Sequence, residues 1–94
     1  MKNDWPFDQP RNAACFSLRQ IFEDGKPILH VTHDADDHGW QFLGLEDARE
    51  EDAWVVGLEE VVKRDPSILQ LADMPPGWHA WRQTETDEWK RQER

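Results

Sequence analysis

Short runs of alternating apolar and polar residues mark the first half of the chain. Such alternation predicts β-strands over residues 13–22 (AACFSLRQIF) and 26–33 (KPILHVTH), because side chains two positions apart in a strand share a face. The Asp24-Gly25 pair between the two runs favours a tight turn. These two strands are therefore expected to form a hairpin.

A third strand is predicted over residues 39–44, where Trp40 and Phe42 share a face that should meet the core. The next segment, residues 45–53 (LEDAREEDA), lacks an apolar face and is interpreted as an exposed acidic loop or turn. Further strands are predicted over residues 54–56 and 78–82, which are rich in tryptophan and contain valine or alanine.

Helical spacing appears between these last two strands. Leu58, Val61 and Val62 recur at helical intervals, and the helix must end near Asp65 because Pro66 disfavours helical backbone in the residue before it. Asp65 is also well placed to cap a second short helix, with Pro66 at its first position. Two short helices are therefore expected in the second half of the chain.

The predicted elements indicate an α+β fold, with a small antiparallel β-sheet of about four to five strands packed against one or two short helices. The chain has 94 residues, the size of one domain. That single α+β domain is assigned to residues 13–82, between an N-terminal tail (1–12) and a polar C-terminal tail (83–94). Trp5 and Trp89, which lie in the tails, are expected to dock back onto the domain.

Negative charge is concentrated in the middle of the chain. The formal net charge is −9, and residues 34–60 carry all of it, with Arg49 as their only base. Such a field repels nucleic acid and anionic membranes and attracts a basic protein surface. We therefore expect a basic protein partner and neither direct nucleic-acid nor membrane binding, although the acids could serve solubility alone. The candidate partner-binding residues are Asp34, Asp36, Asp37, Glu46, Asp47, Glu50, Glu51, Asp52, Glu59 and Glu60.

Histidines and aspartates gather between His30 and His38, and their types are compatible with a metal ion. On a strand, His30 and His33 point to opposite faces and cannot grip one ion. The loop that follows imitates the start of a calcium-binding loop, but Leu45 stands where a bidentate glutamate is required. No metal and no cofactor is predicted, and a small metal- or ligand-binding regulatory domain remains an alternative.

Signals for catalysis and for export are weak. Cys15 is the only cysteine, which excludes an intramolecular disulfide, and its apolar neighbours indicate a buried structural thiol. No nucleophile motif or glycine-rich phosphate loop occurs, so an enzyme is not expected. Without an apolar leader or a membrane-length apolar run, the chain is predicted to be cytoplasmic.

Several short motifs lie in a recognisable order. They are Ala14-Cys15-Phe16-Ser17, Gly25-Lys26-Pro27-Ile28, Asp37-His38-Gly39-Trp40-Gln41-Phe42-Leu43, Val56-Gly57-Leu58-Glu59-Glu60-Val61-Val62, Asp65-Pro66-Ser67-Ile68-Leu69, Pro76-Gly77-Trp78 and Trp81-Arg82. This order resembles a small bacterial family first catalogued as a domain of unknown function and later described as immunity proteins of polymorphic toxin systems. The resemblance spans residues 13–82 and contains no catalytic motif.

The resemblance implies a protein that neutralises a toxin by binding it. On this hypothesis the acidic middle covers the cationic substrate groove of a nuclease, in place of the phosphate backbone. An alternative is a phosphate-mimicking inhibitor of a nucleic-acid-handling defence complex. The oligomeric state does not follow from the sequence.

Overall fold

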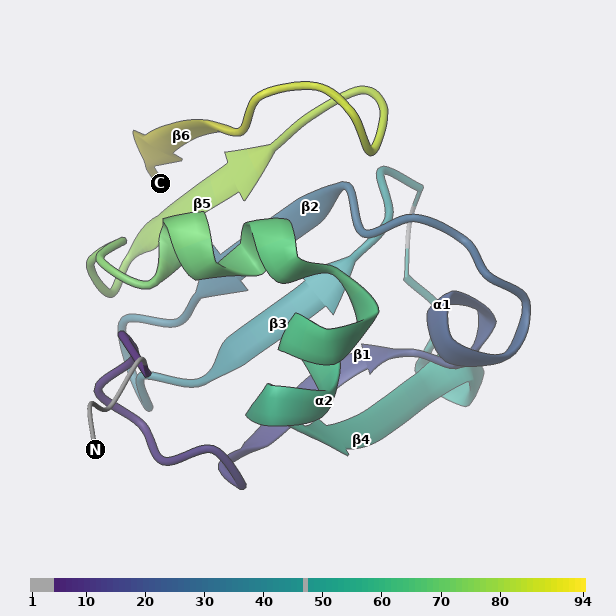
Figure 1. Cartoon of the computed structure of the whole chain (residues 1–94), viewed down its shortest axis with the longest axis horizontal. Coiled ribbons are helices and arrows are strands. Elements are labelled where there is room, and N and C mark those ends of the chain that lie inside the picture. Colours follow the sequence, from purple (N-terminus) through teal and green to yellow (C-terminus); the bar gives the residue numbers. More distant parts are fainter. Residues whose placement is uncertain (1–4, 47) are drawn as a thin grey trace.

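A mixed β-sheet of six strands runs through the part of the chain that the computed structural model describes, residues 5–46 and 48–94. The strand order is β4-β1-β3-β2-β5-β6 (Figure 1). In chain order the elements are β1 (Ala14–Leu18), α1 (Arg19–Glu23), β2 (His30–His33), β3 (Trp40–Leu43), the 3-10 helix η1 (Glu50–Asp52), β4 (Ala53–Gly57), α2 (Leu58–Arg64), the 3-10 helix η2 (Pro66–Leu71), β5 (Trp78–Trp81) and β6 (Lys90–Glu93). The predicted α+β fold is confirmed, with one strand more than the largest number expected.

The sheet is antiparallel except between β1 and β3, which run parallel. The predicted hairpin between the first two strands is wrong, because β1 pairs with β3 and β4 and not with β2. Gly25, with φ of 73°, ends helix α1 instead, and the N–H of Lys26 donates to the carbonyl of Gln20 at 3.1 Å. An Asp-Gly pair allows positive φ equally well after a helix and in a hairpin turn.

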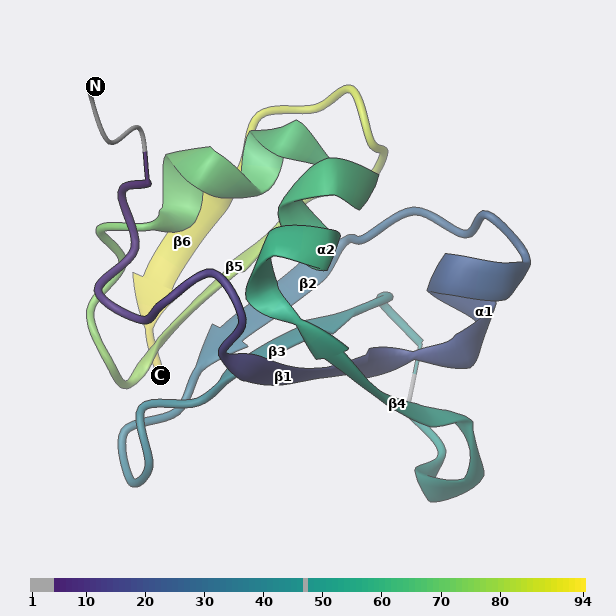
Figure 2. The same ribbon diagram turned by 60° about the horizontal axis from the view of Figure 1, so that its bottom comes forward.

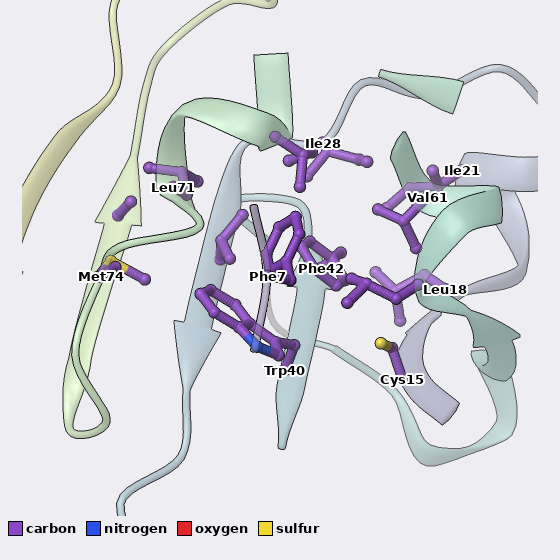
Figure 3. Packing of buried hydrophobic residues seen from close by; sticks show 14 residues of the cluster. Phe7, Cys15, Leu18, Ile21, Ile28, Trp40, Phe42, Val61, Leu71 and Met74 are labelled. Carbon is purple, nitrogen blue, oxygen red and sulfur yellow. The ribbon is translucent and has the colours of Figure 1, made fainter. Parts of the chain in front are cut away.

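Helices α2 and η2 cover one face of the sheet, and the core lies between these two layers (Figures 1 and 2). Trp40 and Phe42 are both buried there, as predicted. The Asp65 carboxylate accepts a hydrogen bond from the N–H of Ser67 at 3.0 Å, which confirms the predicted cap. Figure 3 shows how side chains from the sheet and from the helices meet in this core.

The segment before β1 packs onto the domain over the residues that the structure describes. Phe7 is buried in the core, and its ring packs nearly perpendicular to that of Trp40, with ring centroids 5.4 Å apart. Trp5 lies 5.3 Å from the Phe7 ring and donates its indole N–H to the carbonyl of Gln9. The expected docking of Trp5 is confirmed, while residues 1–4 of the predicted tail lie outside the described residues.

The segment 83–94 was predicted as a polar tail, and this prediction is wrong, because it contains β6, which pairs antiparallel with β5. All four residues of β6 are exposed. An edge strand needs no apolar alternation, so its sequence gives little signal. Trp89 docks as expected: its indole N–H donates to the Ser67 hydroxyl at 3.0 Å, and the guanidinium of Arg82 lies over its ring.

Candidate protein-binding surface

The acidic residues of the middle segment do not form one continuous surface. Asp34, Asp36 and Asp37 lie in the β2–β3 turn, where β3 begins, whereas residues 44–52 follow the end of β3. Four strand residues separate these ends by about 13 Å. The predicted set is therefore divided between opposite ends of the sheet, and Asp47 lies outside the described residues.

Two aspartates of the β2–β3 turn bind their own backbone. Oδ1 of Asp34 accepts from the N–H of Asp36, and Oδ1 of Asp37 accepts from the N–H of Gly39, both at 2.8 Å. His38 between them adopts φ of 61°, in the left-handed region. These carboxylates stabilise the turn, so a structural role explains Asp34 and Asp37 without a partner.

Three further predicted acids form ion pairs within the domain. Asp52 pairs with Arg19 at 3.1 Å and raises the pKa of that guanidinium. The other two belong to the first turn of α2: Glu59 pairs with Arg11 at 2.6 Å, and Glu60 with Lys63 at 3.5 Å.

Glu46, Glu50 and Glu51 remain as exposed acids of the β3–β4 connection. Within residues 5–46 and 48–94, the side chains of Glu50 and Glu51 form no ion pair or hydrogen bond. Both belong to η1, which leads directly into β4. Glu50 and Glu51 therefore carry negative charge that no ion pair among the described residues compensates, as does Asp36 in the β2–β3 turn.

An exposed apolar pair lies on β1 and β4, the second of which follows η1 directly. Phe16 of β1 and Val55 of β4 are opposite each other in the strand register, and their exposed fractions are 54% and 65%. Their neighbours Cys15 and Ser17 are buried, so Phe16 and Val55 face away from the helices. Sequence reasoning missed this pair, because every residue of the run Trp54-Val55-Val56 is apolar and no alternation reveals which one faces solvent.

A groove of about 770 Å³ lies at the same end of the domain. It runs between the α1–β2 connection and the β3–β4 connection, and its charged walls carry both signs, including Arg19, Lys26, Arg49, Glu46 and Asp52. Such mixed walls do not select a ligand of one charge.

Histidines occupy both faces of strand β2, as predicted. His33 is buried, stacks on Trp40 with ring centroids 4.0 Å apart, and donates from Nδ1 to the carbonyl of Met74 at 2.7 Å. On the opposite face, Nε2 of His30 and Nδ1 of His79 are 3.0 Å apart. Among the described residues, no group of three or more metal-binding side chains is placed to hold an ion.

The pKa values of His30 and His79 are both lowered. Burial is the main cause for each, and the charge of Arg94 adds to it. The neighbouring His79 also lowers the pKa of His30. Sequence reasoning did not single out His79, because its neighbour in space lies 49 positions away in the chain.

Cys15 is buried, as predicted, and burial raises the pKa of its thiol to about 11. A thiol with such a pKa stays protonated near neutral pH and makes a poor nucleophile. The environment of Cys15 therefore fits a structural thiol in the core.

No helix among the described residues has the length and apolar character needed to span a bilayer. Comparison of the chain with protein-family models, with characterised proteins and with solved structures found no match.

Proposed function

We propose that this chain is an acidic protein-binding inhibitor, similar in action to an immunity protein, that neutralises a basic partner such as a toxin nuclease. The observation that carries the proposal is that Glu50 and Glu51, which form no ion pair among the described residues, lead directly into β4, whose Val55 forms an exposed apolar pair with Phe16. Charged groups steer a partner toward a surface, and buried apolar contacts then hold it. The resemblance to immunity proteins supports the same function.

The binding surface differs from the one that the acidic segment alone suggests. Asp34, Asp37, Asp52 and Glu59 are engaged within the domain. The partner is therefore proposed to bind at the end that carries Glu46, Glu50 and Glu51 and across the adjoining face of β1 and β4. An electrostatically steered complex of this kind forms quickly and weakens as salt is added.

The first prediction concerns a double charge reversal, Glu50→Lys with Glu51→Lys. The partner is first captured from the source cells at low salt and identified by mass spectrometry, and its association rate is then measured by surface plasmon resonance. We expect the variant to associate at least tenfold more slowly at low salt, because the steering field is reversed where the complex forms. Circular dichroism should show an unchanged fold.

A matched control separates local charge from net charge. Asp36→Lys with Glu88→Lys changes the net charge equally, but at exposed positions outside the proposed surface. This control should associate at nearly the rate of the unaltered chain. Equal slowing of the two double variants, or no slowing of either, would contradict the proposed binding surface. A basic nuclease as the captured partner supports toxin neutralisation, and a nucleic-acid-handling defence complex supports the phosphate-mimicking alternative.

A further inference from the structure

The two edges of the sheet have opposite chemical character. Strand β6 at one edge has the sequence Lys-Arg-Gln-Glu, with every residue exposed. Strand β4 at the other edge has the sequence Ala-Trp-Val-Val-Gly, without a charge or a proline. Charged residues protect sheet edges against pairing with other chains. Edge β6 has this protection, and edge β4 lacks it.

The hydrogen-bond pattern directs backbone groups of β4 outward. The N–H of Leu58 donates to the carbonyl of Ala13 at 2.9 Å, which makes these two residues a hydrogen-bonded pair at the end of the β1–β4 ladder. Hydrogen-bonded and non-hydrogen-bonded pairs alternate in an antiparallel ladder. The Phe16–Val55 pair, three positions along the ladder, is therefore a non-hydrogen-bonded pair. The N–H and C=O of Val55 consequently point away from β1 toward the free edge.

Acidic residues stand on both sides of β4. Glu51 and Glu50 precede Val55 by four and five positions, and Glu59 and Glu60 follow it by the same intervals. If a second copy paired with β4 in antiparallel fashion about Val55, η1 of one copy would lie near the start of α2 of the other, and both carry glutamates. Like charges brought close repel each other, so a second copy is a poor occupant for this edge.

A cationic strand fits the same edge. Its lysine or arginine residues would meet Glu50 and Glu51, which have no ion-pair partner among the described residues, whereas Glu59 and Glu60 are already partly compensated by Arg11 and Lys63. Its β-branched side chains would continue the exposed apolar face of Phe16 and Val55.

We propose that β4 accepts an extended, cationic segment of the partner protein as an additional strand of the sheet. This inference rests on the proposed function and specifies how the basic partner is held. Main-chain hydrogen bonds to Val55 supply affinity, and the glutamates of η1 select basic residues at the end of the added strand.

The test uses a short synthetic peptide as probe, with two lysines at each end and alternating threonine and valine between them. Its matched control is the same peptide with N-methyl groups on alternate backbone nitrogens, so that charge and side chains are kept while hydrogen bonding along one edge is lost. Binding is followed by amide chemical shifts and by hydrogen-exchange protection in the full chain. We expect protection of the Val55 N–H with the first peptide and at least tenfold weaker binding of the methylated peptide.

Two variants examine the protein side of the same contact. Val55→Pro removes the outward N–H without removing a bond to β1, since proline is tolerated where an edge N–H faces solvent. Val55→Thr keeps the N–H and the β-branched shape. We expect the proline variant to bind the probe about tenfold more weakly than the threonine variant, with the same circular dichroism spectrum for both.

The outcomes distinguish this inference from the proposed function. If the two peptides bind equally, or the probe protects no β4 amide, strand addition is overturned. If Val55→Pro leaves capture of the natural partner intact while the double reversal at Glu50 and Glu51 abolishes it, electrostatic neutralisation stands and strand addition fails. Weakening of both the probe and the natural partner by Val55→Pro supports the inference.

Discussion

Among the described residues, Arg82 is the one lysine or arginine whose side chain is buried. It is 2% exposed, and its Nε and Nη2 atoms donate to the carbonyl of Ile28 at 3.1 and 3.0 Å. Nη1 donates to the Ser67 hydroxyl and to the carbonyl of Glu85, and Nη2 also pairs with the Asp65 carboxylate. One side chain therefore joins the segment before β2, the start of η2 and the β5–β6 connection.

Replacement of Arg82 by methionine keeps a long side chain but removes all five donors. Asp65 then loses its cation, and the buried carbonyl of Ile28 loses its side-chain donors, so we expect the free energy of unfolding to fall by about 3–5 kcal/mol. Urea denaturation measures the loss. The control is Arg91→Met, which breaks an ion pair with the exposed Asp73 and should hardly change the denaturation midpoint. If both variants lost a similar amount of unfolding free energy, the buried hydrogen-bond network of Arg82 would not be the cause of the loss.

Strands β2 and β5 are joined at the element scale by their backbone ladder and by the contact between His30 and His79. Because folding lowers the pKa of both imidazoles below the ordinary value of 6.5, the unfolded chain binds more protons than the folded chain once the pH falls through 6.5. Their contribution to stability is therefore complete above pH 6.5 and is lost as the pH falls through the lowered values.

A double variant, His30→Gln with His79→Gln, should remove this part of the pH dependence. We expect the unaltered chain to lose more unfolding free energy than the variant between pH 7.5 and 5.5, as measured by urea denaturation at each pH. His38→Gln serves as the control, because His38 lies exposed in the β2–β3 turn. If the double variant loses as much as the unaltered chain, the two imidazoles do not carry the effect.

Elements defined by local signals could be predicted from the sequence. Helix α2, the cap at Asp65 and the buried face of β3 each depend on residues a few positions apart. Strand pairing depends on distant residues, so Asp24-Gly25 could not reveal that β1 lies between β3 and β4. The polar strand β6 was not predicted for a related reason. Its place in the fold comes from backbone pairing to β5 and not from an apolar face that the sequence would reveal.

The candidate surface could be predicted only in part. Composition located the negative charge in the middle segment, and Glu46, Glu50 and Glu51 remain available for a partner. Two other candidate acids, Glu59 and Asp52, form ion pairs with Arg11 and Arg19. These bases lie 48 and 33 positions away in the chain from the acids that they bind. No periodicity in the sequence shows such pairing.

For the whole molecule, the unlike edges of the sheet determine how many partners can be added. A sheet with one receptive edge and one charged edge can accept a single added strand. The charged edge β6 disfavours pairing with a further chain, so the sheet does not grow by repeated edge-to-edge addition. Light scattering should therefore find complexes of one domain with one partner segment and no fibres. Lys90→Val with Gln92→Val would give β6 an apolar character, and the masses should then rise with concentration as copies join edge to edge. If β4 accepts a strand as proposed, the four polar residues of β6 therefore limit the domain to one such partner.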